Sequence, residues 1–529
     1  MRRPAAFAPL RHPAFRLLWI ANLASNTGLF IQNTAAGWLM TSLDPAPMMV
    51  SFVQASSMLP VFLLALPAGA LADIMDRRIF LIGAQLWMML MAALLCLMTW
   101  SGALGPWGLI AFTFALGAGL AMTFPAWAAT TPELVPREDL VGAIALNGIG
   151  FNLTRAVGPA IGGLVVAWFG IEAAFALNAL CILTLVVALF LWKREKIASR
   201  MPREHFLSAV RAGARFVAAT PAMHAAILRA VVFFLFGSAV WGLLPLLVRE
   251  TLALGPQAFG LLLGCMGAGA VAAGFVLPAM RARLDRSGLV FWSSLLSGLS
   301  LLILAALHHW AFAALGMLLY GVSWISAAST LQASAQMAAP SWVRARAIGI
   351  YQMCFFGAMA LGSALAGWMA GRLGVELTMA LFAAGAVAGA IGVRGWRLEG
   401  DAAAPPPKVA LARPEPAAAE LRAMLHEGEN RVLEVVRYHV APADRDRFRA
   451  TMAECRRVRL RGGAALWRLY EDVAHPERWV ELWTIESWEE HLREAARLTA
   501  EDRALLARAA AFDARDSGPE ATRYVNVRV

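Results

Sequence analysis

The chain has 529 residues, of which 59% are hydrophobic and 15% charged, against roughly 45–50% and about 25% in an ordinary soluble domain. This composition excludes a purely soluble globular protein. The net charge of +11 is uneven, because residues 1–397 carry 25 Lys/Arg and 12 Asp/Glu whereas residues 398–529 carry 21 and 23. An apolar, cationic first part is typical of a membrane protein with basic loops, not of a nucleic-acid-binding protein.

Twelve apolar runs in the first part are long enough to cross a bilayer as helices, which takes roughly 20 residues. We therefore predict an all-α polytopic membrane protein. The runs lie near 17–41, 48–72, 79–100, 104–127, 140–168, 171–192, 223–247, 257–280, 288–307, 310–335, 347–370 and 375–393. The stretch before the first run has no cleavage site, and we interpret it as a cytoplasmic tail.

The charge of the connections predicts the orientation. An even number of spans puts both ends on one side, and the connections on that side carry most of the Lys/Arg, whereas the opposite connections offer only Arg249 and Arg372. Because basic loops stay in the cytoplasm, we expect both termini there, in the inner (plasma) membrane of a bacterium. The basic cytoplasmic connection 193–222 divides the spans into halves of six, about 14–192 and 223–397.

An internal repeat supports these two halves. At a constant offset of 204 residues, identical residues recur around the fifth and eleventh spans, and these are Pro136 and Pro340, Ala143 and Ala347, Gly158 and Gly362, Gly163 and Gly367, Gly170 and Gly374, and Glu172 and Glu376. Two six-helix halves related as parallel repeats are the arrangement of transporters that rock around a site at the bilayer midplane.

The last part of the chain predicts a separate domain. Residues 398–430 are rich in Ala and Pro and are typical of a semi-extended linker. Residues 431–529 then alternate as strand, helix, strand, strand, helix and strand. This order predicts a cytoplasmic α+β domain of the ferredoxin-like type.

Several motifs resemble a known family. GALADIMDRR at 69–78 resembles the signature between the second and third helices of the major facilitator superfamily, and RAVGPAIGG at 155–163 resembles the fifth-helix motif of its exporters. SNTGLFIQNTAAGWLMTSL resembles more narrowly the transmembrane secretion effector branch, which includes siderophore exporters of the enterobactin type. The resemblance implies alternating-access export driven by an ion gradient. We expect H⁺ as the coupling ion, although the mid-membrane stretches contain no Asp or Glu.

The same resemblance implies a conformational latch at the cytoplasmic face. Its expected members are Gly69, Asp73, Arg77 and Arg78 between the second and third spans, with Arg344 and Arg346 before the eleventh. In this interpretation the Asp73 carboxylate pairs with a cation or with free helix amides and holds the outward-open state. The alternative is a set of solvated interfacial charges, which contribute about 0–1 kcal/mol per exposed pair.

Arg155 is the leading candidate for substrate binding. It lies well inside the fifth span, where inserting Arg costs roughly 2.5–3.5 kcal/mol, so it is expected to face a cavity and a partner. It is either a counter-ion for an anionic or catechol-bearing substrate, or a structural Arg bonded to carbonyls or amides of a neighbouring helix. Amide side chains in the spans also face a partner or water, and those expected to line the cavity are Asn22, Asn26, Asn33, Gln54, Asn152 and Gln332.

The fifth span has the residues of a gating helix. Gly158, Gly162 and Gly163 remove side-chain bulk, so that another helix can approach closely. Pro159 lets the helix bend. We therefore predict a tightly packed but bendable seam along this span.

We interpret the chain as a secondary active transporter that exports a small molecule, such as a siderophore, a drug-like compound or a secondary metabolite, across the lipid bilayer. We expect no enzymatic activity, cofactor or nucleic-acid partner, and no metal, since the five cysteines lack metal-ligand spacing. Two alternatives stay open, an importer of the same fold and a transporter fused to a substrate-modifying enzyme domain. Dimerisation through the C-terminal domain is a further expectation.

Overall fold

The computed structural model describes residues 7–136, 138–193, 206–340, 343–398, 432–486, 488, 491, 498, 500–515 and 517–526. The chain forms two compact units. The first comprises Met1–Glu204, Ala225–Ser334 and Tyr351–Leu398, and the second comprises His205–His224, Ala335–Ile350 and Glu399–Val529. Apart from Leu398, the predicted linker 398–430 lies outside the described residues.

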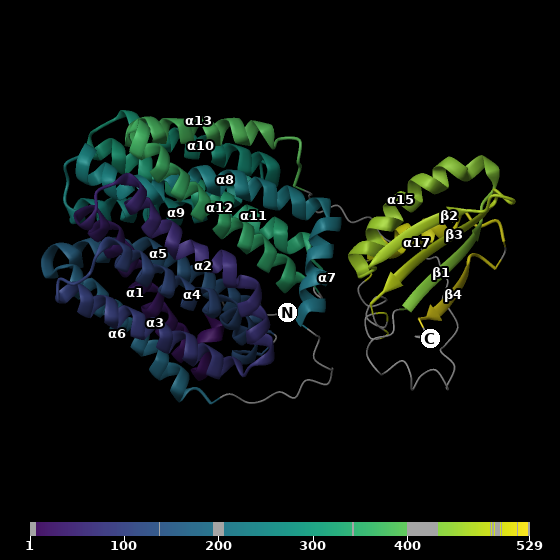
Figure 1. Cartoon of the computed structure of the whole chain (residues 1–529), viewed down its shortest axis with the longest axis horizontal. Helices are drawn as coiled ribbons and strands as arrows, with labels where there is room; N and C mark the ends of the chain where they lie inside the picture. The colour runs from purple at the N-terminus through teal and green to yellow at the C-terminus, as the bar shows by residue number, and fades with distance from the viewer. Residues whose placement is uncertain are drawn as a thin grey trace. The chain divides into compact units, whose positions relative to one another are not determined.

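Long helices that lie alongside one another make up the membrane part (Figure 1). Those of the first half are α1 Pro13–Leu43, α2 Pro47–Ile74, α3 Arg77–Trp100, α4 Pro106–Leu134, α5 Leu140–Phe169 and α6 Ile171–Leu191. Those of the second half are α8 Pro221–Leu246, α9 Pro256–Arg281, α10 Arg286–Ala306, α11 Trp310–Ala338, α12 Arg344–Leu373 and α13 Val375–Gly392. Each predicted span corresponds to one of these helices, so the all-α polytopic fold is confirmed.

Helix α1 differs from the others in its polarity. Among the described residues, 11 helices are long and apolar enough to cross a membrane, and α1 is not one of them. Its 31 residues include Asn22, Asn26, Gln32 and Asn33, which lower its mean hydropathy. The Gln32 side chain is buried and accepts a hydrogen bond from Asn178 Nδ2 of α6. The polarity of α1 therefore lies partly inside the helix bundle, where amides find partners.

Local sequence explains where several helices begin and turn. Prolines stand at the start of α1 and α2, where the missing N–H costs little. Asp76 caps α3, because its carboxylate accepts from the backbone N–H of Arg78 at 3.0 Å. Gly170 and Gly374 adopt φ of +89° and +83° in the one-residue turns after α5 and α12, a conformation that favours glycine. These two glycines are a matched pair of the internal repeat.

The basic connection between the halves contains an additional helix, α7 Phe206–Ala219, which the apolar runs did not predict. Its residues Phe216 and Val217 are buried, whereas Ala214 and Ala218 are exposed. With 14 residues, α7 is too short to cross a bilayer. It packs against the C-terminal domain within the second unit, which explains why this unit begins before the predicted boundary at residue 398.

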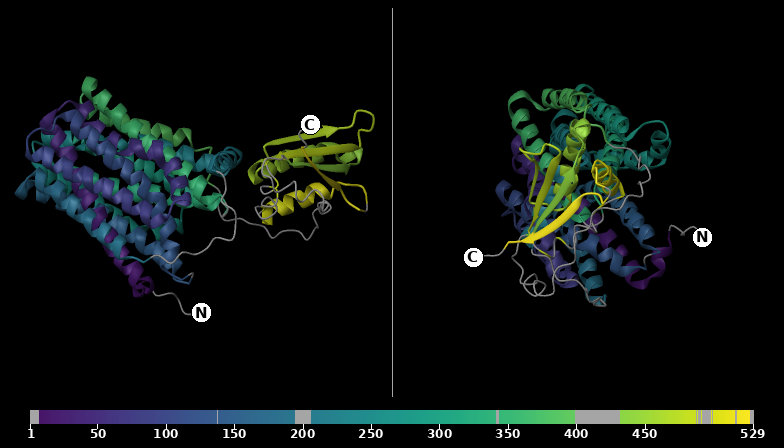
Figure 2. Two further views of the ribbon diagram at one scale, coloured as in Figure 1. Left: turned by 60° about the horizontal axis from the view of Figure 1, so that its bottom comes forward. Right: turned by 90° about the vertical axis from the view of Figure 1, so that its right-hand side faces the viewer.

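The C-terminal part of the second unit is an α+β domain. Its elements are β1 Val432–His439, the 3₁₀ turn Pro442–Asp444, α15 Arg445–Gly462, β2 Leu466–Glu471, β3 Arg478–Ile485, α17 Ala500–Ala510 and β4 Glu520–Val525. The sheet order is β2-β3-β1-β4, and all neighbours are antiparallel. Helices α15 and α17 cover one face of the sheet (Figure 2), and Phe448, Cys455 and Leu506 belong to the core beneath them. The ferredoxin-like prediction is confirmed.

Candidate functional site

A cavity of about 380 Å³ lies in the membrane part, and both halves contribute to its wall. The first half supplies residues of α1, α2, α4 and α5, and the second half supplies residues of α8, α9, α11 and α12. Most of the lining is apolar or aromatic, with a few polar side chains placed among it. A concave, mostly apolar site with a few polar groups is the usual form of a small-molecule binding site.

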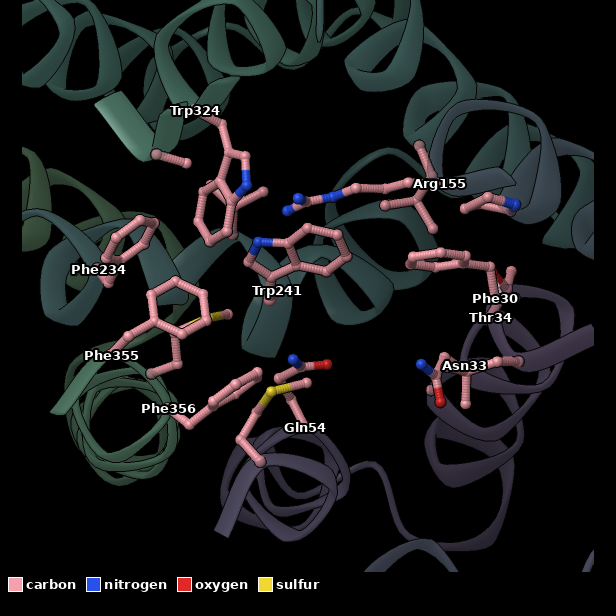
Figure 3. A pocket seen from close by; sticks show the side chains of 18 of the residues that line it. Phe30, Asn33, Thr34, Gln54, Arg155, Phe234, Trp241, Trp324, Phe355 and Phe356 are labelled. Atoms are coloured by element: carbon pink, nitrogen blue, oxygen red, sulfur yellow. Dashed lines mark hydrogen bonds between the residues drawn. The ribbon is translucent and has the colours of Figure 1, made fainter. Parts of the chain in front are cut away.

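Arg155 of α5 provides a positive charge in this cavity. Its Cζ lies 4.8 Å from the ring centroid of Trp324 and 5.5 Å from that of Trp241, and Figure 3 shows the guanidinium beside these two indoles. Toward the described residues, Arg155 forms no hydrogen bond and no ion pair. The structural role considered from the sequence was bonding of Arg155 to carbonyls or amides of a neighbouring helix. The described residues show no such bond. The N–H groups remain available to a bound molecule.

Amide side chains supply most of the remaining polarity. Asn33, Gln54, Asn152 and Gln332 all line the cavity together with Arg155, which brings together five residues singled out from the sequence. Asn152 Nδ2 donates to the Gly148 carbonyl at 2.9 Å, so its amide oxygen stays available. These groups can both donate to and accept from a polar cargo.

Two predicted amides do not line the cavity. Asn22 and Asn26 are absent from its lining residues, which begin on α1 at Leu29. The two asparagines share a helix face with Asn33, but they lie about three and two turns before it. A shared helix face with Asn33 was not sufficient to predict that Asn22 and Asn26 line the cavity. Their position along the helix separates them from it, and the sequence pattern does not give the depth of the cavity.

The aromatic part of the wall was missed in the sequence. The ring centroids of Phe234 and Phe355 are 4.3 Å apart, and those of Phe355 and Phe356 are 4.7 Å apart. Phe356 of α12 also meets Phe124 of α4 at 6.2 Å, so the aromatic wall crosses from one half to the other. A usable signal was present in the two tryptophans beside Arg155, because tryptophan in membrane helices normally concentrates at the interfaces, not in mid-span.

Contacts between the halves close one side of the cavity. We call this the distal side, where α1 ends and α2 begins. Ser51 Oγ of α2 donates to the Gly242 carbonyl of α8 at 3.2 Å. Arg249 Nη1, just after α8, donates to Thr41 Oγ1 at 2.8 Å and to Ser42 Oγ at 2.6 Å, both on α1. Arg249, interpreted from the sequence as loop charge, thus joins the two halves.

The residues predicted for a gating helix lie at close helix crossings. Cβ atoms added at Gly158 and Gly162 would lie 2.6 Å from Phe30 Cβ and 3.0 Å from Ile31 Cα of α1. A Cβ at Gly163 would lie 2.6 Å from the Cα of Gly260 on α9, in the other half. Pro159 lies between these contacts and lines the cavity. Helix α5 is therefore packed tightly against both halves.

The predicted latch is only partly within the described residues. Gly69 lies in α2, near Pro125 of α4, and the Asp73 side chain lies outside the described residues. Arg77 Nη1 pairs with Glu133 Oε1 of α4 at 2.6 Å. Arg78 donates to the carbonyls of residues 189 and 190 of α6 at 2.9 Å each. These partners of Arg77 and Arg78 belong to the first half, so these contacts hold that half together.

The two other latch arginines belong to the second unit. Arg344 is exposed, and its Nε donates to the Ala339 carbonyl at 3.0 Å, which ties the start of α12 to the residue after α11. Arg346 is partly buried, and a Cβ added at Gly213 of α7 would lie 2.8 Å from its Cβ. A latch between Asp73 and these arginines stays a prediction.

The residues that the structure describes contain no group of three or more His, Cys, Asp and Glu side chains that could hold a metal ion. The chemistry of the cavity therefore rests on a guanidinium, several amides and aromatic rings. This combination binds and orients a molecule by charge, hydrogen bonds and stacking.

Comparison with known proteins identifies the family. The model of the family described as transmembrane secretion effector matches residues 4–528. The chain belongs to this family. A relative, the enterobactin exporter EntS of Shigella boydii, is 28% identical over 366 residues, which are 67% of this chain and 85% of the relative. The staphyloferrin A transporter of Staphylococcus aureus is 24% identical over 297 residues, 54% of this chain and 70% of that protein.

Solved structures place the membrane part in the major facilitator fold. The nucleoside transporter NupG has a TM-score of 0.61 at 12% identity, over 72% of this chain and 99% of that chain. An inward-facing bacterial homologue of the human lysosomal transporter Spinster has a TM-score of 0.55 at 12% identity, over 74% of this chain and 95% of that chain. Such low identities show the fold alone. Membership of the family makes this protein a multi-pass inner-membrane transporter of small molecules.

Proposed function

We propose that this transporter exports a small organic anion by alternating access, and that Arg155 is the counter-ion for the cargo. The observation that carries the proposal is the guanidinium of Arg155 on a cavity wall, beside the rings of Trp241 and Trp324. The N–H groups of Arg155 form stronger hydrogen bonds with a carboxylate or phenolate than with a neutral acceptor. Related proteins named for enterobactin and staphyloferrin A support a siderophore or similar metabolite as cargo.

Substitution of Arg155 tests the proposal. We take benzoate as an anionic probe and benzamide as its uncharged counterpart. Arg155→Gln should lower benzoate affinity by about tenfold or more, since hydrogen bonds to charged groups contribute about 1.5–3 kcal/mol, while benzamide affinity stays the same. Arg155→Lys should keep part of the benzoate affinity, because the charge stays but the bidentate contact is lost.

The test also needs a measure of folding. Detergent-solubilised monodispersity on the same samples separates loss of binding from loss of fold. Normal benzoate affinity in well-folded Arg155→Gln protein contradicts the counter-ion role. Efflux from a deletion strain, followed by profiling of extracellular metabolites, then identifies the natural cargo, and accumulation of the cargo inside wild-type cells would indicate import instead.

The energy source and the orientation are further parts of the proposal. We infer H⁺ as the coupling ion from the family, and transport by proteoliposomes under an imposed pH gradient at zero membrane potential tests it. We place both termini in the cytoplasm, because the Lys/Arg-rich connections belong to their side. We also keep Asp73, Arg344 and Arg346 as a cytoplasmic latch, which Asp73→Asn should weaken.

For the C-terminal domain we propose an interaction role, in particular dimerisation. On the sheet face opposite α15 and α17, Leu466, Tyr470 and Tyr524 are exposed. Exposed apolar side chains on one sheet face support association with a partner. Light-scattering masses of the full chain and of a chain ending at Leu398 test this role. Turnover of a cargo by the full-length protein would instead favour a fused enzyme.

A further inference from the structure

Arg155 and its aromatic partners belong to different halves of the transporter. Arg155 lies on α5 in the first half, whereas Trp241 lies on α8 and Trp324 on α11 in the second. The cation–π contacts at 5.5 and 4.8 Å therefore join the halves at the wall of the cavity. In a transporter whose halves rock against each other, a contact of this kind differs between states.

The indole of Trp324 is a fixed partner. It is 2% exposed, and its ring lies 4.9 Å from that of Phe234 and 5.7 Å from that of Tyr320. The Tyr320 hydroxyl in turn donates to the Gly237 carbonyl of α8 at 2.7 Å. Trp324 thus packs against α8 as well as lying on α11. A displacement of its ring is therefore passed on to these two helices of the second half.

We propose that the contact of Arg155 with Trp324 and Trp241 senses the cargo. In the empty protein it holds the halves in the arrangement described here. An anionic group that binds Arg155 provides a stronger partner than an indole face and releases the contact, which frees the halves to move. This inference rests on the proposed function, because it assumes that the cargo binds at Arg155. It assigns Trp324 and Trp241 a positioning role: they act through Arg155 and do not themselves pair with the anionic group of the cargo.

The energetics favour a measurable effect. A desolvated cation–π contact changes an equilibrium by about thirtyfold, equivalent to about 2 kcal/mol. A ligand shifts the balance of two states only by the ratio of its affinities for them. Loss of the indole should therefore change the balance of the empty protein, and it should also change how far an anion shifts that balance.

The first experiment uses the empty full-length protein. Spin labels on cysteines that replace Ala46 and Gln257, between α1 and α2 and at the start of α9, report the separation of the halves on the distal side. In a background without the native cysteines, Trp324→Leu should raise the population of the distally open state by about tenfold or more over the parent protein. An unchanged distance distribution in Trp324→Leu overturns the inference.

Two variants control for packing. Trp324→Phe keeps an aromatic face for Arg155 and should restore most of the parent distribution. Phe382→Leu removes a buried ring of α13 that packs against Phe236 of α8 in the same half, does not line the cavity and makes no cation–π contact with Arg155 among the described residues, so it should leave the distribution unchanged. If Phe382→Leu opens the protein as far as Trp324→Leu does, general loss of packing explains the result and the inference is wrong.

The second experiment separates this inference from the proposed function. Benzoate binding by Trp324→Leu should be tighter than that of the parent, by up to about thirtyfold, because Arg155 no longer gives up an indole when the anion binds. Equal or weaker binding, which a purely structural role of Trp324 predicts, overturns the inference. If the parent protein and Arg155→Gln bind benzoate equally, the proposed function fails, whereas the state distribution of the empty protein still decides the role of Trp324.

Discussion

Glu434 shows how a single buried residue ties the C-terminal domain together. It lies on β1 and is 3% exposed. Its Oε1 accepts from Arg523 Nε of β4 at 2.7 Å and lies 2.8 Å from His491 Nδ1. Burial on its own raises the pKa of Glu434, but the bonds and charges of His491 and Arg523 outweigh it and hold the pKa below the ordinary value. The carboxylate therefore stabilises the fold only while it is ionised.

This arrangement predicts acid sensitivity of the domain. Because the pKa of Glu434 is lower in the folded than in the unfolded chain, its contribution is present above the ordinary carboxyl range and is lost as the pH falls through the folded pKa. Glu434→Gln should lower the free energy of unfolding at pH 7 by about 3 kcal/mol and flatten its decline below about pH 4.5. Hydrogen exchange of β1 and β4 amides in the full chain, corrected for intrinsic rates, measures both effects.

Glu520 offers a matched control on the same sheet. Its side chain is 60% exposed and lies 3.9 Å from Arg515 Nη1, so Glu520→Gln should change the free energy of unfolding by less than about 1 kcal/mol. Equal losses in Glu434→Gln and Glu520→Gln would show that burial of the charge does not decide the effect.

At the scale of elements, the crossing of α5 and α9 contributes to closure of the distal side. A Cβ at Gly163 would lie 2.6 Å from Gly260 Cα and 2.8 Å from the Pro256 carbonyl oxygen, and both are backbone atoms that cannot rotate aside. A Cβ at its repeat partner Gly367 on α12 would lie 2.9 Å from the Pro47 carbonyl oxygen of α2. The two halves thus repeat the same close crossing, each against the start of a helix in the other half.

Gly163→Ala should loosen this closure. The added methyl group forces α5 and α9 apart, at a cost of about 1–3 kcal/mol, and should lower the thermal stability of the purified protein. In a background without the native cysteines, a cysteine that replaces Val53 in the cavity wall should then react faster with an impermeant maleimide from the distal side.

Gly148→Ala in the same helix is the control for this prediction. A Cβ at Gly148 meets nothing within 4 Å, so the substitution should be neutral or slightly stabilising, since Ala is a better helix former than Gly. Equal labelling rates in the Gly163→Ala and Gly148→Ala variants contradict the role of the crossing.

The elements that could be predicted are those that depend on local pattern. Hydropathy located the spans because lipid requires an apolar helix of fixed length, and it did so least clearly for the polar helix α1. The turn glycines Gly170 and Gly374 lie in gaps between the predicted apolar runs. Arg155 could be predicted as a site residue because a charged side chain in the middle of a membrane span is costly unless it faces a cavity or a partner. Its partners Trp241 and Trp324 were not found, since the faces that α8 and α11 turn toward α5 depend on packing between halves, which no local pattern contains.

At the scale of the whole molecule, the orientation of the chain in the membrane determines which side of the bilayer each end of the cavity faces. With an even number of spans, the start of α1 and the end of α13 belong to one side of the membrane. The basic connection 193–222 and the basic stretch 394–397 after α13 belong to the same side. The connection 101–105 between α3 and α4 belongs to the other side and carries no charged residue. Because positive connections are retained in the cytoplasm during insertion, this asymmetry supports the proposed cytoplasmic position of both termini.

Reporter fusions test the orientation directly. Alkaline phosphatase, which is active only outside the cytoplasm, should be inactive when fused after Arg397 or near Pro202 and active when fused after Gly102. A fluorescent protein should give the reverse pattern. Each pair of fusions controls for expression, because one reporter must be active at every site. Phosphatase activity after Arg397 together with inactivity after Gly102 would invert the topology and place the closed distal side of the cavity in the cytoplasm, which contradicts the proposed orientation.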